Sequence, residues 1–187
     1  MARKRCRCYD ESGHAHELTF SCFRRLPLLS RDRTREWLVE AIDEARVRER
    51  FDLWAYVIMP EHVHILILPR DPDYEISRIL WRIKRPVGRR AITYLRENAP
   101  SFLAKLRIKR DEGNEETRFW QAGGGYDRNI IEPMTARRVI DYIHLNPVRR
   151  GFVEKPEEWV WSSARWYAGV RPVVLDVDPT LPQVYEM

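Results

Sequence analysis

The sequence predicts an α+β fold, a ferredoxin-like split β-α-β sandwich with a mainly antiparallel sheet of about four to five strands. Two observations favour this fold class. Runs rich in aromatic and β-branched residues alternate with longer segments whose apolar residues recur at helical spacing. Their order along the 187 residues is strand, helix, strand, strand, helix, strand, helix. We expect one domain at residues 1–170 and a C-terminal tail at residues 171–187.

The first strand and the first helix come early in the chain. Residues 15–23 alternate well enough for a strand. Ser30 or Asp32 can cap the helix that follows, which we expect to run to Glu49. Its apolar residues fall at helical spacing, so this helix should cover the sheet. They are Trp37, Leu38, Ala41, Ile42 and Ala45.

Residues 53–68 contain two apolar runs that meet at Pro60, which predicts a β-hairpin because proline is tolerated at a strand start but not within a central ladder. In the second strand, His62 and His64 point to the same face, about 7 Å apart along the strand. Two such imidazoles can converge on one metal ion or one phosphate. A buried histidine is also common as a hydrogen-bonded core residue, so the pattern alone leaves both interpretations open.

The second half of the domain is less regular. A helix should span about residues 75–97, and Pro86 should kink or split it and expose the Lys84–Arg85 corner. Residues 98–116 look irregular, and residues 118–121 are expected to form the fourth strand.

A third helix should start near Pro133 and end at Pro147. Tyr142 and Asn146 lie one turn apart on it, and Arg138 lies one turn earlier on the same side. Half-buried helical tyrosines are common, so the spacing alone gives Tyr142 no role. We expect two helices on one face of the sheet, which leaves the other face, with the two histidines, open to a substrate.

Composition narrows the class of protein. No apolar run approaches the roughly 18 residues of a membrane span, and the basic amino terminus lacks the apolar segment of a secretory signal, so we expect a cytoplasmic protein. The three cysteines, Cys6, Cys8 and Cys22, should be free thiols. Lys and Arg outnumber Asp and Glu by 33 to 28 and are clustered, which favours a polyanionic partner.

Five short segments follow one another in a fixed order. They are Tyr56-Val-Ile-Met-Pro-Glu-His-Val-His, Phe119-Trp-Gln, Asp127-Arg128, Asp141-Tyr-Ile-His-Leu-Asn-Pro-Val-Arg-Arg-Gly and Trp159-Val-Trp-Ser-Ser. Together they resemble the HUH-type tyrosine transposases of the Y1 family, and most of all the REP-associated tyrosine transposases. The resemblance covers about residues 15–167. One departure is the run of three glycines at residues 123–125, where relatives often carry bulkier residues.

The resemblance implies an enzyme that nicks and rejoins single-stranded DNA at REP-like hairpins through a 5′-phosphotyrosine. It implies Tyr142 as the nucleophile, and His62, His64 and Asn146 as ligands of a divalent ion, Mg²⁺ or Mn²⁺. We expect no membrane partner, and either a monomer or a homodimer. The basic side chains expected to contact DNA are Lys84, Arg85, Arg89, Arg90, Arg138, Arg149 and Arg150.

Three other readings stay open at the level of sequence. The chain can be a DNA-binding regulator of the same fold that does not cleave, or a metal-dependent phosphoesterase that uses water as its nucleophile. It can also be an interaction domain with a contact patch at Trp159–Trp166, although we interpret that cluster mainly as core at the sheet edge. The clustered Lys and Arg residues could line a basic groove, and the proline-rich, mildly acidic tail could fold across that basic groove as a regulator.

Overall fold

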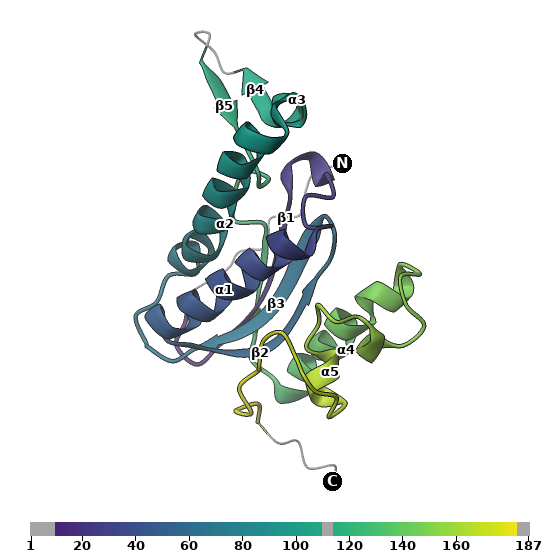
Figure 1. The fold of residues 1–187 in the computed structure, drawn as a ribbon. Helices are drawn as coiled ribbons and strands as arrows, with labels where there is room; N and C mark the ends of the chain where they lie inside the picture. Colours follow the sequence, from purple (N-terminus) through teal and green to yellow (C-terminus); the bar gives the residue numbers. More distant parts are fainter. Residues whose placement is uncertain (1–9, 110–113, 183–187) are drawn as a thin grey trace, which may run out of the picture.

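The structure, a computed structural model, describes residues 10–109 and 114–182. Its centre is a four-stranded antiparallel sheet with the strand order β2-β3-β1-β6 (Figure 1). The strands are β1 (Ala15–Ser21), β2 (Phe51–Ile58), β3 (His62–Pro69) and β6 (Tyr126–Ile130). The predicted α+β fold is confirmed.

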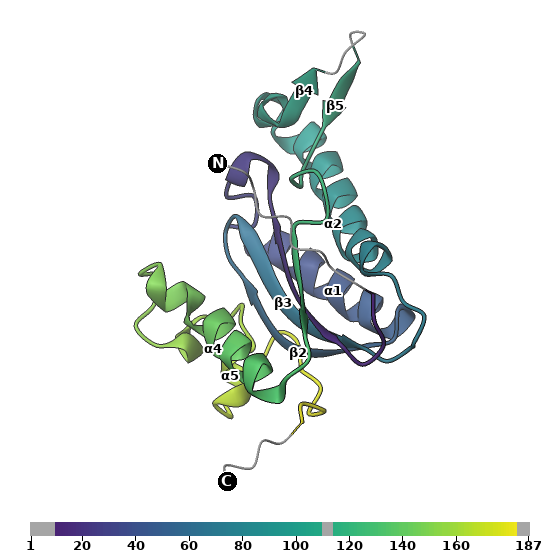
Figure 2. The same cartoon turned by 180° about the vertical axis from the view of Figure 1, so that it is seen from behind.

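Helices cover both faces of this sheet. Helices α1 (Asp32–Arg48) and α2 (Ile76–Asn98) pack on one face, and α4 (Pro133–Arg149) packs on the other (Figures 1 and 2). Because successive side chains of a strand point to opposite faces, the sheet contributes residues to two separate hydrophobic cores, one on each face. In β2, Tyr56 and Ile58 belong to the core beneath α1 and α2, whereas Ala55 and Val57 belong to the core beneath α4. The expectation that one face is open is therefore wrong, and only part of that face stays accessible.

The fourth strand lies later in the chain than the sequence predicts. Residues 118–121 contribute a single bridge, between Trp120 and Cys22, and the fourth strand is β6. Phe119 is buried among the residues beneath α1 and α2, which explains the misleading apolar signal. The segment expected to be irregular contains a small hairpin of β4 (Arg107–Lys109) and β5 (Glu115–Thr117).

The sequence predicts that Pro86 kinks or splits its helix and that Pro147 ends its helix, but neither helix is divided at its proline. Helix α2 continues through Pro86, and α4 continues past Pro147 to Arg149. A proline removes one backbone donor, but the residues after it can still close helical bonds. In α4 the N–H of Arg150 donates to the carbonyl of Asn146 at 3.2 Å.

Short elements connect and complete these layers. They are α3 (Pro100–Leu103), α5 (Ala164–Tyr167) and the 3₁₀ turns Phe23–Arg25, Ala104–Leu106 and Pro156–Glu158. The residue before α1 is Arg31, which makes no side-chain cap, so the expected cap by Ser30 or Asp32 is wrong. Cys22 is a fully buried free thiol, and burial raises its pKa to about 12. Cys6 and Cys8 lie outside the described residues.

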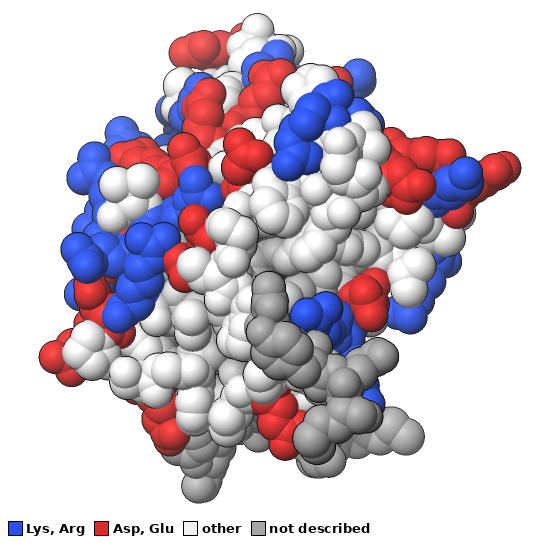
Figure 3. Space-filling view, turned by 90° about the horizontal axis from the view of Figure 1, so that it is seen from below, with Lys and Arg blue, Asp and Glu red and all other residues white. Residues whose placement is uncertain are grey.

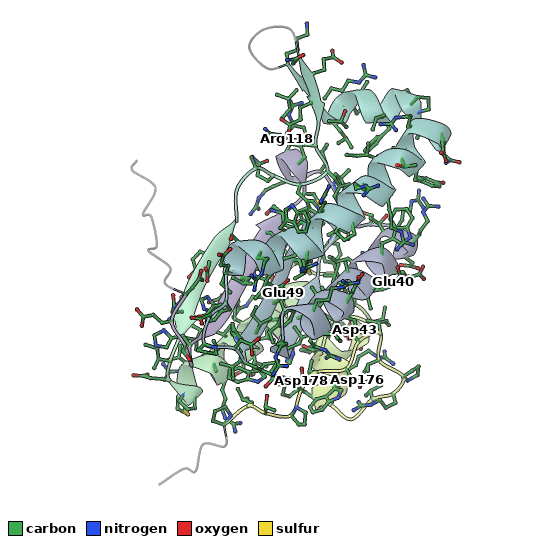
Figure 4. All side chains as sticks on the ribbon, turned by 90° about the vertical axis from the view of Figure 1, so that its left-hand side faces the viewer. Glu40, Asp43, Glu49, Arg118, Asp176 and Asp178 are labelled. Atoms are coloured by element: carbon green, nitrogen blue, oxygen red, sulfur yellow. The ribbon has the colours of Figure 1, made fainter. Side chains whose placement is uncertain are left out.

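The C-terminal segment packs along the outer edge of β2. The N–H of Asp178 donates to the carbonyl of Leu53 at 2.8 Å, and the hydroxyl of Tyr56 donates to the carbonyl of Leu175 at 2.9 Å. Asp176 and Asp178 also meet Arg46 of α1, close to Asp43 (Figure 4). The described part of the tail therefore lies on β2 and α1, and not across the basic groove as the sequence suggested.

Within the described residues no helix is both long and apolar enough to cross a membrane. The tryptophan-rich segment closes the same β2 edge, as expected. The indole N–H of Trp159 donates to the carbonyl of Ile58 at 3.1 Å, and the N–H of Ser163 donates to the carbonyl of Tyr56 at 3.0 Å.

Candidate active site

The two histidines of β3 lie side by side beneath α4. Their rings are perpendicular, with centroids 4.8 Å apart, and only 6% of His62 and 5% of His64 is exposed. Strand pairing fixes them, because His62 lies opposite Ser21 and His64 opposite Thr19 in β1. The predicted convergence of the two imidazoles on one face is therefore present in the fold.

Each histidine is held through the same ring nitrogen. Nδ1 of His62 lies 3.1 Å from Oε1 of Glu61, and Nδ1 of His64 lies 2.7 Å from Oγ1 of Thr19. Within residues 10–109 and 114–182, neither Nε2 atom has a hydrogen-bond partner. Because the Glu61 carboxylate only accepts, neutral His62 carries its proton on Nδ1 and presents Nε2 as an acceptor, which is the arrangement that metal-binding histidines adopt. His64 takes the same tautomer when its Nδ1 donates to the Thr19 hydroxyl.

Burial keeps these imidazoles neutral. It lowers the pKa of His62, although Glu61 raises it in part, and it lowers the pKa of His64 to about 3 with help from the neighbouring charges of His62 and Arg25. The neutral ring is the form that binds a metal ion.

Tyr142 faces His64 from α4. The ring centroids are 5.4 Å apart at an interplanar angle of 86°, and 40% of the tyrosine is exposed. The guanidinium of Arg149 lies 5.3 Å from the centroid of the same phenol ring. The phenol is thus neither sealed in the core nor turned away from the histidines.

Asn146 lies one helical turn after Tyr142, and its Nδ2 donates to the carbonyl of Tyr142 at 3.2 Å. Only 8% of this residue is exposed, and its Oδ1 has no hydrogen-bond partner among the described residues. The helix end that carries Asn146 is tied to β3, because Nη1 of Arg150 donates to Oε1 of Glu61 at 2.8 Å.

By donor type, imidazole nitrogen and amide oxygen suit a divalent ion. No three His, Cys, Asp or Glu side chains cluster in the described part of the chain, so a carboxylate-rich site is not formed there. Two free imidazole nitrogens and one amide oxygen are a smaller, neutral donor set, which leaves other coordination positions for a phosphate or water.

A groove of about 590 Å³ opens beside His64 and Tyr142. We call it the tyrosine groove. Its walls come from β1, β3, β6, α4 and the turn after β1. They are Glu17, Thr19, Arg25, His64, Tyr126, Arg128, Thr135, Arg138, Val139 and Tyr142. Arginines thus outnumber carboxylates around the phenol, which favours an anionic ligand.

Arg25 is a groove residue that no signal of any kind in the sequence indicates. Its backbone and that of Arg24 both adopt left-handed conformations, with φ of 53° each. Such a conformation costs free energy in a non-glycine residue and often marks a functional site. Arg25 makes no ion pair with the described residues, and its charge acts on both histidines. No sequence pattern signals this position.

The basic residues expected to contact DNA separate into two groups. Arg138 lines the tyrosine groove and Arg149 lies over the Tyr142 ring, whereas Arg150 is paired with Glu61. The four basic residues of α2 lie beyond the opposite face of the sheet. They are Lys84, Arg85, Arg89 and Arg90.

Arg90 is occupied on the protein itself, by an ion pair with Glu40 and by contact with the ring of Trp37 at 4.8 Å. Seen from below, Lys and Arg gather at one side of the visible face, where they lie beside Asp and Glu (Figure 3). Arg90 and Arg150, both predicted to contact DNA, are thus paired with carboxylates of the protein itself.

By family the chain is a transposase: it belongs to the IS200-like transposases, whose family model matches residues 11–146. Among individual proteins it is similar to the REP-associated tyrosine transposase of Escherichia coli K12, with 28% identity over 129 residues, 68% of this chain and 63% of that protein. It is also similar to a candidate REP-associated tyrosine transposase of Haemophilus influenzae, with 28% identity over 144 residues, 73% of this chain and 76% of that protein.

A solved structure of a REP-associated tyrosine transposase bound to a REP hairpin has the same fold. It aligns with a TM-score of 0.65 over 99% of this chain and 100% of that chain, at 21% sequence identity. The family resemblance found in the sequence motifs is confirmed.

Proposed function

We propose that this protein nicks and rejoins single-stranded DNA next to a hairpin, with Tyr142 as the nucleophile. The observation that carries the proposal is the approach of the His64 and Tyr142 rings, 5.4 Å apart, at the wall of an arginine-lined groove. The REP hairpin bound by the structural relative supports a hairpin as the DNA partner. The proposed setting is the cytoplasm, where chromosomal DNA is the available polyanion.

The reaction is a phosphoryl transfer without a nucleotide cofactor. The phenol oxygen of Tyr142 attacks the phosphorus, the bond from phosphorus to the 3′-oxygen breaks, and a 5′-phosphotyrosine and a free 3′-hydroxyl result. The 3′-oxygen takes up one proton, and the phenol loses one. Rejoining is the reverse, in which a 3′-hydroxyl attacks the phosphotyrosine and releases the phenol.

His62, His64 and Asn146 would hold the divalent ion, Mg²⁺ or Mn²⁺, through the two Nε2 atoms and Oδ1. When bound, such an ion neutralises charge on a non-bridging phosphate oxygen. Arg25, Arg128 and Arg138 would bind the phosphodiester and orient it toward Tyr142. Arg149 lies over the phenol ring, where its positive charge would stabilise negative charge that develops on the phenol oxygen during attack.

The decisive experiment traps the covalent intermediate. The full chain is incubated with Mn²⁺ and a hairpin oligonucleotide that has single-stranded flanks, and adducts are resolved on a denaturing gel and located by mass spectrometry. We expect an adduct on Tyr142 that disappears in Tyr142→Phe, while DNA binding stays within about twofold. Tyr126→Phe, which removes the hydroxyl of the other tyrosine that lines the tyrosine groove, should still give an adduct.

The alternatives give different results in the same assay. Binding with neither cleavage nor adduct would identify a DNA-binding regulator. Cleavage that never yields an adduct would identify a phosphoesterase that uses water.

A further inference from the structure

Among the described residues, the wall of the tyrosine groove contains one carboxylate, Glu17 of β1, and the proposed function gives it no role. Only 7% of this residue is exposed. We propose that Glu17 donates a proton to the 3′-oxygen as the bond from that oxygen to phosphorus breaks, and that it takes a proton from the 3′-hydroxyl during rejoining. This role as general acid and base rests on the proposed function, which supplies the leaving oxygen.

Strand pairing sets the position of Glu17 relative to the reacting groups. Thr19, two residues later in β1, lies opposite His64 in β3, and Glu17 itself lies opposite Arg128 in β6. Residues two apart on a strand, and residues paired across strands, point to the same face of a sheet. Glu17 therefore points to the same face as His64, about 7 Å along β1 from the Thr19–His64 pair.

The geometry of the displacement decides which wall of the groove can serve the leaving oxygen. The attacking and leaving oxygens lie roughly in line, on opposite sides of phosphorus. Tyr142 approaches from α4, so the 3′-oxygen faces away from its phenol. Glu17 belongs to the sheet, which forms a different wall of the same groove, and is therefore placed to reach that oxygen.

The other polar side chains that line the groove are poorer proton donors. Its arginines stay charged, because a guanidinium has a pKa above 12. The hydroxyls of Thr19 and Thr135 are alcohols, as the leaving group is, and so are no stronger as acids. His64 is neutral and is a proposed ligand of the ion. Tyr126 carries the remaining acidic hydroxyl, so its variant is the matched control for Glu17.

The surroundings of Glu17 favour its protonated form. Burial raises the pKa of Glu17, and Arg128, whose Nη1 lies 3.7 Å from Oε2, lowers it only in part. A bound phosphodiester adds a negative charge to the groove, which raises the pKa of the carboxyl further. Arg25 and Arg138, which also line the groove, face this phosphate in the proposed function. A protonated Glu17 also does not repel the DNA.

The protons balance without another reactant. In nicking, Glu17 passes its proton to the 3′-oxygen and becomes a carboxylate, while the phenol proton of Tyr142 passes to water. In rejoining, the 3′-hydroxyl gives its proton to the Glu17 carboxylate as its oxygen attacks phosphorus, and the released phenol takes up a proton from water. Both side chains thus return to their starting states.

A sulfur atom in the DNA tests this role. Two hairpin oligonucleotides of the same sequence carry either oxygen or sulfur at the 3′ position of the nicked phosphate, which is located from the wild-type product. A thiol has a pKa of about 8.5, so a sulfur leaving group departs without a proton. Single-turnover nicking with Mn²⁺ is measured for the full wild-type chain, Glu17→Gln, Glu17→Asp and Tyr126→Phe, and thermal unfolding confirms that the variants fold.

We expect Glu17→Gln to nick the oxygen-linked DNA about 100-fold more slowly than the wild type, which is the low end of what a general acid contributes. On the sulfur-linked DNA its rate should lie within about threefold of the wild type, because that leaving group needs no acid. Glu17→Asp, which keeps the acid, should recover part of the lost rate on the oxygen-linked DNA. Tyr126→Phe should change both rates by the same factor.

Equal losses of Glu17→Gln on both linkages, or no loss on either, would overturn the proposal, and so would a selective rescue of Tyr126→Phe by sulfur. The wild-type adduct reports separately on Tyr142. An adduct together with equal losses would contradict the role of Glu17 alone, whereas no adduct with either DNA would contradict the proposed function and the role of Glu17 with it.

Discussion

Glu61 and Arg150 join the entrance of β3 to the end of α4 through a hydrogen bond of 2.8 Å, and the same Oε1 atom of Glu61 accepts from Nδ1 of His62. Burial would raise the pKa of the Glu61 carboxyl, but Arg150 and His62 together hold it below its ordinary value. One buried carboxylate thus orients a proposed metal ligand and positions the helix that carries Tyr142 and Asn146.

Replacing Glu61 by Gln should weaken metal binding. The amide can still contact His62 but carries no negative charge to balance Arg150 or to make the imidazole more basic, and loss of such a partner typically costs 10- to 100-fold in metal affinity. Isothermal titration with Mn²⁺ in the absence of DNA measures this directly. Glu154→Gln, on the exposed turn after α4, is the control and should bind Mn²⁺ as the wild type does. Unchanged affinity in Glu61→Gln would remove its positioning role.

Arg25→Gly should separate the function of the side chain from the cost of its backbone. Glycine adopts a φ of 53° without strain, so the fold should be kept or slightly stabilised, whereas cleavage at saturating DNA should fall about 100-fold because a phosphate-binding cation is lost. Arg24→Gly changes the same backbone geometry outside the tyrosine groove. It should cleave like the wild type, and a comparable loss in both variants would argue against a specific role for Arg25.

Two neighbouring glycines of the run that departs from the family pattern, Gly124 and Gly125, should differ in how well they tolerate alanine. Gly125→Ala combines φ of 90° with a clash at 2.1 Å and should lower the free energy of unfolding by about 2 kcal/mol or more. Gly124→Ala meets its nearest atom at 3.8 Å and should change it by less than about 0.5 kcal/mol. Urea unfolding of both variants measures the difference, and similar midpoints would contradict the tight edge at Thr19.

The Glu49 carboxylate should make the free energy of unfolding fall at acidic pH. Burial raises its pKa, but Arg82 and Arg78 more than offset this and hold the pKa below the ordinary value of 4.5. A carboxyl with a lowered folded-state pKa stabilises the fold above its unfolded pKa and loses this contribution as the pH falls through the folded value. Glu49→Gln should therefore cost about 1–2 kcal/mol at pH 7 and much less at pH 3. Urea midpoints at the two pH values measure the change, and an equal cost at both would contradict it.

Several elements of the site follow from local periodicity. The two-residue period of β3 sets His62 and His64 on one face, and the helical repeat sets Tyr142 and Asn146 on one side of α4. Both patterns need only a few neighbouring residues, so they are visible in the sequence. The divalent metal, the phosphotyrosine and the single-domain boundary remain predictions.

The rest of the site depends on contacts between distant segments. Thr19 and Arg128 reach the tyrosine groove because β1 pairs with β3 on one side and with β6 on the other. The sequence of β6, Tyr-Asp-Arg-Asn-Ile, is too polar to predict a strand. Only its last residue is buried in the core beneath α4. The sequence predicts a strand at Phe119 instead, because an apolar residue can signal either contact with the core or pairing in a sheet. Phe119 contacts the core.

The docking of Leu175–Asp178 along β2 also decides what a shortened chain would do. That stretch forms hydrogen bonds with Leu53 and Tyr56 of β2. Without it, more of β2 would be an exposed edge strand, and exposed edge strands pair with other chains and cause aggregation. Truncation of the chain at Gly169 would therefore reduce the solubility of the protein, independently of any effect on the rate of DNA cleavage. A soluble tag belongs after this stretch and not in place of it.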